Sequence, residues 1–406
     1  MHPSAFESSS SRSSERLDSR TSERRAFQVL VPDPPVPAPI ERISPTLYET
    51  LLGCPARAAW SAHGRRDALA PHPLALLGTC FHGVMEAVQK GRISGNADEC
   101  QAAARDSFDV LAARIHEDAH PLLKVKFPSP EKLPYYNLFR ERAAVLAGEY
   151  CVRASDRDGL GSDGQGAVAE QRFTSSDGLI VGRPDLIDLR SSEVIDYKTG
   201  IASEDDWRVS EREARQLNLY VYLASEAGLS LSRGTIIRGN GETATIDIAP
   251  AAAEAEAQNA RDALAAYNAS LEGRTFYELA RPAPDNCRMC PCIPMCEPFW
   301  AAADATWQVD CGVHVEGTVV AVEQSTMQAT ALVSLEVEAS RGTVGAATVS
   351  VEQVPLLWVT ADGDREPRVG DVIRIVDARL TSLEDPVVVR ADRIMTAVWR
   401  MGAIGD

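Results

Sequence analysis

Apolar residues recur at spacings of three and four over several stretches of the chain, which is the period of an amphipathic helix. A helix is also expected to begin at Ser44 and Pro45, because serine is a preferred N-cap and proline suits the first helical position. Strand-like segments occur at 168–198 and 233–238. The pattern therefore predicts an α/β fold with a mixed central sheet flanked by helices. The other predicted helices cover 78–91, 98–118, 135–154, 208–226 and 251–271.

Composition divides the chain into three predicted regions. Residues 1–39 are rich in serine and arginine and then in proline, a composition typical of a disordered tail. Residues 40–305 carry the α/β pattern, and an Asp- and Gly-rich loop is expected at 156–167. Residues 308–406 alternate short β-type runs with turns, which predicts a small β-barrel. Its predicted strands are 313–322, 331–338, 348–354, 372–380 and 387–394.

The entry to one barrel strand, Gly370-Asp371 followed by Val-Ile-Arg-Ile-Val, is similar to a strand entry of OB-folds. Such folds bind single-stranded nucleic acid with aromatic and basic residues. The barrel region has few aromatic residues beyond Trp358 and Trp399, and it has many acids. Two interpretations of this region therefore remain: an OB-like barrel that binds nucleic acid, and a module that docks a protein.

Two carboxylates and a lysine occur in adjacent predicted strands, 178–189 and 193–198, joined by a short polar turn. Alternate residues of a strand share a face, so Asp196 and Lys198 point the same way, and the hairpin brings Asp185 beside them. Two carboxylates bind Mg²⁺ or Mn²⁺, which acidify a bound water and offset charge on a phosphorane. The pattern predicts metal-dependent phosphodiester hydrolysis, in which Lys198 positions the water or stabilises the charge. A solvated strand face with a weak ion pair is the alternative.

The order Pro-Asp185, then Asp196-x-Lys198, resembles the PD-(D/E)XK nuclease superfamily. The Gly-x-x-Asp form, the Asp-Tyr-Lys-Thr-Gly run and the later Gln216-x-x-x-Tyr220 resemble its RecB-like branch. The resemblance implies that Asp185 and Asp196 bind metal and that Lys198 is catalytic. It also implies that Gln216 and Tyr220, four residues apart on one helix face, support the site or contact the DNA backbone.

The same branch carries a histidine on an early helix, and His82 in Gly-Thr-Cys-Phe-His-Gly matches it. The resemblance implies that His82 is a third metal ligand, whereas a satisfied core histidine is the alternative. Glu170 lies where the branch often has an acidic residue, but we expect a structural role or a surface charge for it. Asp188 competes with Asp185, yet its spacing of three places it on the opposite strand face.

The nine cysteines are odd in number and scattered, and no signal peptide is predicted, which argues against a disulfide framework. Cys287, Cys290, Cys292 and Cys296 are crowded enough to indicate a metal site, either Zn²⁺ or a 4Fe-4S cluster. Cys54-Pro before the core and Cys-x-x-Cys-x5-Cys after it resemble the iron–sulfur RecB-like nucleases. The resemblance implies that Cys54, Cys287, Cys290 and Cys296 bind the cluster, with Cys292 as an extra thiol. The others are expected to be ordinary buried thiols: Cys80, Cys100, Cys151 and Cys311.

Charge and length limit the function. The 406 residues suffice for two or three domains, and a net charge of −17 requires any DNA path to be a local groove. The chain lacks the Gly-x4-Gly-Lys-Ser/Thr phosphate loop, so it is not expected to be a helicase itself. It has no apolar run of membrane-spanning length and no signal peptide pattern, which predicts a cytoplasmic protein. Candidate basic residues for the groove are Arg57, Arg65, Arg66, Lys124, Lys126, Arg140 and Arg142.

The resemblance and the residues together predict a metal-dependent DNA nuclease with a structural 4Fe-4S cluster. We expect an exonuclease that acts on single strands or DNA ends in repair or in defence against foreign DNA. One alternative is a weakly active or inactive DNA-binding scaffold that works beside a separate helicase. Another is a zinc protein with an unrelated hydrolase fold.

Overall fold

The structure is a computed structural model of the chain. It divides into two compact units, of which the larger is formed by Pro32–Ala303 and the smaller begins at Asp304. The predicted tail up to residue 32 and the centre of the loop expected at 156–167 lie outside the described residues. The structure describes residues 33–64, 71–158, 166–200, 208–325, 332–345, 348–355, 368–384, 386–391 and 396–401.

The larger unit contains a mixed sheet, which confirms the predicted α/β class. The 5-stranded sheet has the order β1-β4-β5-β6-β7. Only β5 and β6 pair in parallel, and the other neighbours are antiparallel. The strand β7, with its short Thr-Ala-Thr-Ile-Asp alternation, was not predicted. The strands are β1 (Ala167–Ala169), β4 (Leu186–Asp188), β5 (Glu193–Lys198), β6 (Arg233–Arg238) and β7 (Thr243–Asp247).

The single strand predicted over 178–189 is wrong. The chain forms β3 (Val181–Gly182), which pairs with β2 (Phe173–Thr174), and then β4, which joins the main sheet. The break falls at Pro184, because proline has no N–H to donate to a ladder. Asp185 therefore lies just before β4, where the side chain is not confined to one face of a continuous strand.

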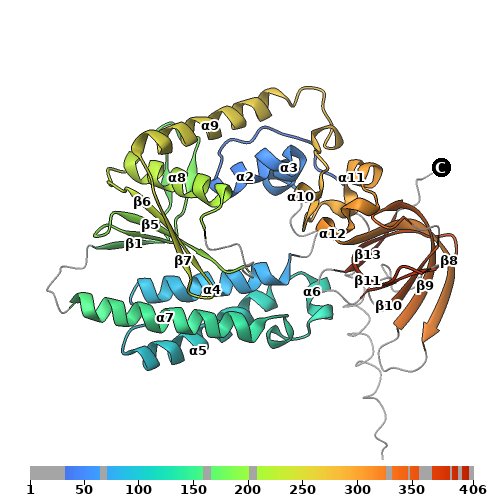
Figure 1. Cartoon of the computed structure of the whole chain (residues 1–406), viewed down its shortest axis with the longest axis horizontal. Helices are drawn as coiled ribbons and strands as arrows, with labels where there is room; N and C mark the ends of the chain where they lie inside the picture. The colour runs from blue at the N-terminus through green and yellow to red at the C-terminus, as the bar shows by residue number, and fades with distance from the viewer. Residues whose placement is uncertain are drawn as a thin grey trace, which may run out of the picture. The chain divides into compact units, whose positions relative to one another are not determined.

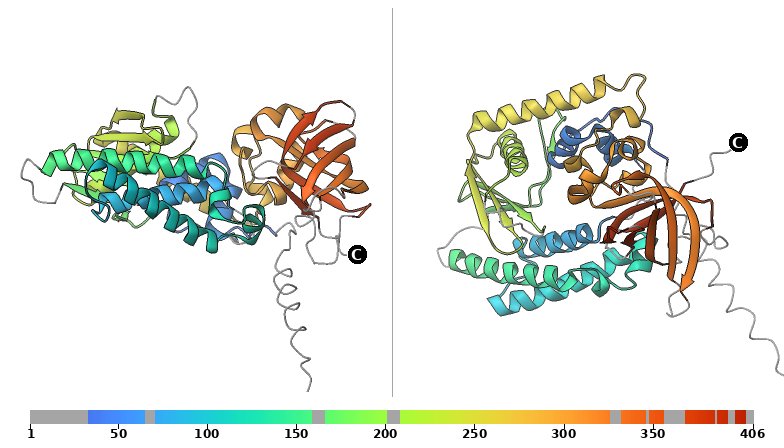
Figure 2. Two further views of the ribbon diagram at one scale, coloured as in Figure 1. Left: turned by 90° about the horizontal axis from the view of Figure 1, so that it is seen from below. Right: turned by 45° about the vertical axis from the view of Figure 1, so that its right-hand side comes forward.

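Helices cover both faces of the sheet (Figure 1). The helices α4 (Pro73–Gln89), α5 (Ala97–Glu117) and α7 (Tyr136–Asp158) lie side by side and share one hydrophobic core. Figure 2 shows the same layer from two further directions. Tyr197 of β5 is buried in that core, so it ties the sheet to the helical layer. On the other side, α8 (Glu211–Glu226) contacts β5 and β6 and packs against α9 (Pro250–Ala269).

The first described helix, α2 (Pro45–Gly53), begins as predicted. The Ser44 side chain accepts the N–H of Leu47 at 3.2 Å. Tyr48 and Leu51 of this helix are buried, whereas Leu52 is exposed. Among the helices that the structure describes, none combines the length and hydropathy needed to cross a bilayer. The remaining helical elements of this unit are α3 (Pro55–His63), α6 (Pro121–Lys126), η3 (Pro130–Lys132), η4 (Tyr277–Leu279), α10 (Pro284–Cys287), η5 (Ile293–Met295) and α11 (Glu297–Ala302).

One cysteine expectation is corrected in the helical layer. Cys100 of α5 and Cys151 of α7 form a disulfide, with their Cα atoms 6.7 Å apart. Both were expected to be ordinary buried thiols. The two helices pack against each other and place these side chains face to face, although 51 residues separate them in sequence. Cys80 is buried and is not in a disulfide.

The smaller unit contains a closed five-stranded β-barrel followed by a further strand. The neighbours run β12-β10-β9-β8-β11-β13, and a pairing of β12 with β11 closes the ring. The β10–β12 pair is parallel and the other pairs are antiparallel. Its interior is filled by alternate apolar residues such as Val315, Leu335 and Val349. The unit contains η6 (Ala305–Trp307), α12 (Gln308–Cys311), β8 (Val313–Ser325), β9 (Leu332–Gly342), β10 (Thr348–Pro355), β11 (Val372–Ser382), β12 (Val387–Arg390) and β13 (Ala397–Arg400).

Candidate active site

Asp185 is positioned by the pairing of β4 with β5. The register aligns Leu186 with Ile195, so the residue before β4 lies beside the second half of β5. One oxygen of Asp185, Oδ2, accepts the backbone N–H of Tyr197 at 2.7 Å. The other, Oδ1, lies 3.1 Å from Nδ1 of His82. Backbone pairing therefore holds this carboxylate between a strand and a helix.

His82 reaches the site because α4 is anchored to β5. The ring of Phe81 meets Tyr197 edge to face at a centroid distance of 6.2 Å, and Gln89 Nε2 donates to the Tyr197 hydroxyl at 3.1 Å. Burial lowers the pKa of His82, but the bond to Asp185 and the negative charges of Asp185, Asp196 and Glu170 outweigh it, so the pKa is raised. The ring faces a concentration of negative charge rather than an apolar core.

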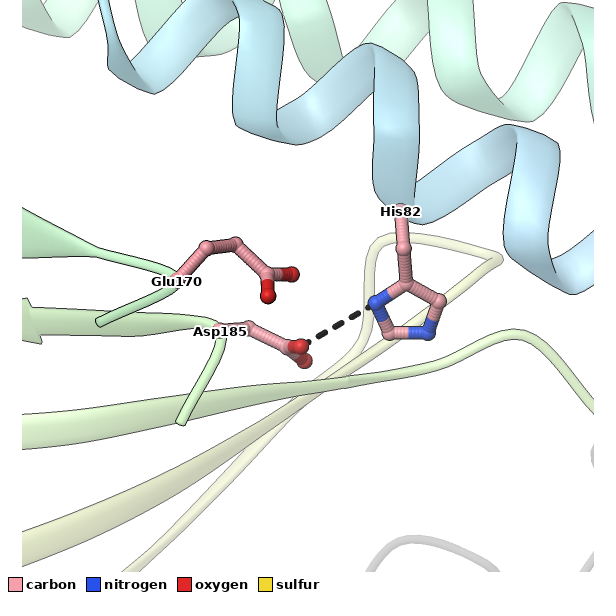
Figure 3. A group of neighbouring side chains, drawn as sticks. All are labelled: His82, Glu170 and Asp185. Carbon is pink, nitrogen blue, oxygen red and sulfur yellow. Dashed lines mark hydrogen bonds and ion pairs between the residues drawn. The ribbon is translucent and has the colours of Figure 1, made fainter. Parts of the chain in front are cut away.

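Glu170 completes a compact group of donors. It follows β1 with a left-handed backbone (φ 54), and its N–H donates to the carbonyl of Asp185 at 3.1 Å. His82, Glu170 and Asp185 each offer a ligand atom within 4.8 Å of the others (Figure 3). Burial raises the pKa of Glu170, and the charge of Asp185 adds to that effect. Sequence reasoning assigned Glu170 a structural or surface role, whereas the fold gathers it with the other two residues.

The second carboxylate belongs to a buried network on the α8 side of β5. Asp196 Oδ2 lies 2.7 Å from Lys198 Nζ, and Asp196 Oδ1 accepts from Gln216 Nε2 at 2.9 Å. Gln216 also accepts from Lys198 Nζ at 2.7 Å and donates to the hydroxyl of Tyr220 at 3.1 Å. Burial raises the pKa of Asp196 to about 6 although Lys198 opposes this. The structure thus joins all four of these predicted site residues.

The helix α8 is fixed at both ends of this network. Ser210 and Glu213 form a capping box at its first turn, and Arg238 at the end of β6 pairs with Glu213 at 3.0 Å. Gly182 lies against the other end, since a Cβ there would be 3.1 Å from the ring of Tyr220. The same Cβ would be 2.6 Å from Leu223 Cδ1, so a larger residue at Gly182 would have to displace side chains of α8. Gln216 is therefore held between two anchored points of the helix.

An open cleft of about 430 Å³ lies over the donor group. Its charged lining consists of His82, Glu170, Asp185 and Arg183, and its remaining polar side chains include Thr79 and Thr199. Asp196 does not line the cleft, and its residue surface is 4% exposed. Of the predicted metal set, the fold thus gathers His82 and Asp185 with Glu170. Asp196 lies near enough to raise the pKa of His82.

The donor set fits a hard divalent cation. Carboxylate oxygens with an imidazole are ligands that Mg²⁺ and Mn²⁺ accept. Neighbouring ligands in an octahedral shell at about 2.1 Å lie about 3 Å apart, which is close to the 3.1 Å between His82 Nδ1 and Asp185 Oδ1. Asp196 Oδ2 is a buried oxygen without a well-aligned hydrogen bond. Burial and the charge of Asp185 raise the pKa values of Asp196 and Glu170, so the neighbouring cations offset the cost of burying these carboxylates only in part.

The cysteines converge on a separate, enclosed cavity. Cys54 lies between α2 and α3, far in sequence from the others, yet all of Cys54, Cys287, Cys290, Cys292 and Cys296 line the same space. Cys54 Sγ accepts the backbone N–H of Arg281 at 3.4 Å. None of the five is in a disulfide. Folding thus brings the early cysteine to the late cluster.

The extra thiol is distinguished by its hydrogen bond. Cys292 donates to Cys290, which together with the positive charge of Arg57 lowers the pKa of Cys290 to about 7 against its burial. The same hydrogen bond, together with burial, raises the pKa of Cys292. Of this pair, Cys290 is the better anionic metal ligand and Cys292 is the better hydrogen-bond donor.

The basic residues expected to form a DNA groove are mostly engaged elsewhere. Arg140 holds both oxygens of Asp109, at 2.7 and 2.8 Å. Arg57 lines the cysteine cavity, whereas Arg65 and Arg66 lie outside the described residues. The guanidinium in the cleft lining is Arg183, which sequence reasoning did not select. Its position in the sequence, between Gly182 and the Pro184-Asp185 pair, could have indicated that it lies in the cleft.

A sequence model of the PD-(D/E)XK nuclease superfamily matches residues 42–297. No curated protein sequence matches. Among solved structures, "Crystal structure of SSO0001" is 19% identical, and the match covers 41% of this chain and 79% of that one. The TM-score is 0.22, too low to support an argument.

Proposed function

Because this chain belongs to the PD-(D/E)XK nuclease superfamily, whose members are typically phosphodiester-hydrolysing nucleases, we propose that it is a Mg²⁺- or Mn²⁺-dependent deoxyribonuclease. The observation that carries the proposal is the convergence of His82, Glu170 and Asp185 beside the Asp196–Lys198 pair. Exonuclease action on single strands or DNA ends, in repair or defence, rests on the resemblance to the RecB-like branch.

Each residue has a proposed role. His82, Glu170, Asp185 and Asp196 would hold the cation, which when bound acidifies a water and offsets phosphate charge. Lys198 directs its ammonium toward the developing negative charge. Gln216 accepts from Lys198 and donates to Asp196, so it keeps both in fixed orientations. Tyr220 in turn holds Gln216.

A cleavage assay tests this function. Labelled single- and double-stranded DNA is incubated with purified protein and Mn²⁺, beside an Asp196→Ala variant and a sample with chelator. We expect wild-type protein to shorten DNA from an end and the variant to leave it intact. If both are equally inactive while the protein still binds DNA, the scaffold that works with a separate helicase is the better description.

We further propose a structural 4Fe-4S cluster bound by Cys54, Cys287, Cys290 and Cys296. Its support is the cavity that all of these cysteines line together. Such a cluster would connect the α2–α3 junction to the end of the unit. Cys292 would donate a hydrogen bond to a cluster sulfur, in place of its present bond to Cys290.

Anaerobic purification separates the two metal assignments. A brown protein with broad absorbance near 400 nm, a rough marker of thiolate-bound iron–sulfur clusters, supports the cluster. Cys290→Ser should lose this absorbance and Cys292→Ser should largely retain it. A colourless protein with stoichiometric zinc would replace the cluster by a zinc site.

The barrel is proposed to be OB-like. Its closed five-stranded ring with β12 inserted between β10 and β11 has a Greek-key order, as OB-folds do. However, β9 exposes Glu336 and Glu338, which repel phosphate. We therefore assign it to docking a protein partner, such as a helicase, rather than to a second DNA contact.

A further inference from the structure

Arg183 is the strongest candidate for a residue with an unassigned role. It lines the cleft beside the donor group, and its side chain is 56% exposed. Gly182 and Pro184 on either side of it are buried, whereas Arg183 and Asp185 are more accessible. Residues two apart in an extended segment share a face, so Arg183 and Asp185 face the same cleft.

Its present partner is one of the proposed metal ligands. Arg183 Nε forms an ion pair with Glu170 Oε2, and this carboxylate is only 10% exposed. The guanidinium thus neutralises a charge that a bound cation would neutralise instead. A cation and Arg183 therefore compete for Glu170.

The second carboxylate near Arg183 holds it weakly. Glu86 Oε2 lies 3.9 Å from Arg183. Glu86 is already paired with Lys90 at 2.6 Å and with Arg92 at 3.4 Å. Once Glu170 is taken by a cation, Glu86 retains its own two cations. Arg183 is then left as a largely exposed guanidinium in the lining of the cleft.

We propose that Arg183 is a positioning residue that alternates between two anions. Without metal it is the counter-ion of Glu170, and with metal it binds a phosphate of the DNA strand, for which guanidinium is a well-matched donor. Binding of the metal then strengthens binding of DNA, and binding of DNA strengthens binding of the metal. The reason is that each favours the state in which Arg183 no longer pairs with Glu170. This inference rests on the proposed nuclease function.

The test uses full-length Lys198→Ala protein, so that DNA is bound without being cleaved. In this background, Arg183→Gln is compared with Arg183→Lys and with Arg114→Gln, an exposed arginine on α5. Mn²⁺ affinity is measured without DNA by electron paramagnetic resonance. The affinity for a short single strand is measured across a KCl series, with and without Mn²⁺.

Arg183→Gln should bind Mn²⁺ about two- to fivefold more tightly, the equivalent of one partly exposed ion pair. It should also bind DNA more weakly with Mn²⁺, with a salt slope smaller by about 0.7 for one lost phosphate contact. Arg183→Lys should restore the slope, and Arg114→Gln should match the parent. A role limited to packing would not strengthen Mn²⁺ binding.

Unchanged or weaker Mn²⁺ binding by Arg183→Gln would overturn the counter-ion role, and an unchanged slope would overturn the phosphate role. In both cases the parent binds metal and DNA, so the proposed function stands. A parent that binds neither Mn²⁺ nor DNA would overturn the proposed function together with this inference.

Discussion

Both units bury carboxylates, but they neutralise them differently. In the barrel, Glu316 is 5% exposed. Its carboxylate accepts hydrogen bonds from Arg341 at 2.5 and 2.8 Å and from Arg374 at 2.6 Å. In the larger unit, three carboxylates lie near one histidine, one lysine and one half-exposed arginine. Glu170, Asp185 and Asp196 are these three.

The pKa values reflect this difference within the larger unit. Burial raises the pKa values of both Asp196 and Glu170. Uncompensated charge inside a protein destabilises the fold unless it is paired or binds a cation. The comparison teaches that a buried acid whose charge is neutralised by neighbouring arginines has a structural role. A group of acids whose pKa values stay raised despite the nearby cations indicates a binding site.

The largest expected effect separates activity from stability. Asp196→Asn keeps the shape of the side chain but removes the charge, so DNA cleavage should fall by at least about a hundredfold. The melting temperature should not fall, because the variant no longer buries this charge. Initial cleavage rates and calorimetry on the same preparation check both parts. A variant that cleaves normally would remove Asp196 from the active site.

The barrel should show the opposite behaviour. Arg374 is 1% exposed, and Arg374→Leu leaves Glu316 with less compensation, so we expect a loss of about 3–5 kcal/mol in the unit's unfolding free energy. Hydrogen exchange of the β11 amides reports this locally. Arg341→Leu is the milder control, since Arg341 is 36% exposed. The rate of DNA cleavage per folded molecule should stay unchanged. A loss of cleavage without a loss of stability would contradict the comparison.

Metal addition should stabilise one unit only. At a free Mn²⁺ concentration one hundred times the Kd, binding adds about 2.7 kcal/mol. We expect slower hydrogen exchange in β4 and β5 and unchanged exchange in β8 and β9. Asp185→Asn should abolish the difference. Equal protection of both units would show that the ion binds elsewhere.

The smallest effect concerns pH. The folded-state pKa of Asp196, about 6, lies above the ordinary aspartate value of 3.8, so the folded protein holds a proton that the unfolded chain releases. Without metal, this group's contribution to stability is full below pH 3.8 and is lost as the pH rises through about 6. Between pH 5 and pH 7 this loss is about 1 kcal/mol.

Chemical denaturation of metal-free protein at pH 5 and pH 7 measures this loss. Asp196→Asn should reduce the difference between the two pH values. Mn²⁺ affinity should rise over the same interval, since the ion competes with protons on Asp196 and on His82, whose pKa is also raised. A stability that rises from pH 5 to pH 7 to the same extent in both proteins would contradict the assignment.

Local pattern was sufficient for most of the architecture. The predicted strands 193–198 and 233–238 coincide with β5 and β6, and the predicted helices differ from those observed mainly at their ends. These elements have strong periodicity and clear caps, so neighbouring residues determine them. The strand predicted across Pro184 failed because the apolar pattern continues where the backbone hydrogen bonding does not.

The candidate site was less accessible to sequence reasoning. Asp196 and Lys198 follow from alternation in a strand, whereas Gln216 and Tyr220 were implied by the resemblance, and the fold joins all four. Glu170 was underrated because nothing local to it indicates that β1 ends beside Asp185. A left-handed residue after a short strand turns its carboxylate into the site only when that pairing exists.

The amino-acid sequence alone determined the order of the acids and the lysine, the faces they occupy, and the crowding of the late cysteines. Tertiary structure decided which distant groups meet: Glu170 with His82, Cys54 with the late cysteines, and Cys100 with Cys151. The reason is that the hydrophobic period and the spacing of motif residues reflect contacts within one or two turns of a helix or a short strand. Contacts across tens or hundreds of residues depend on how buried faces pack, and packing sums weak interactions over the whole chain.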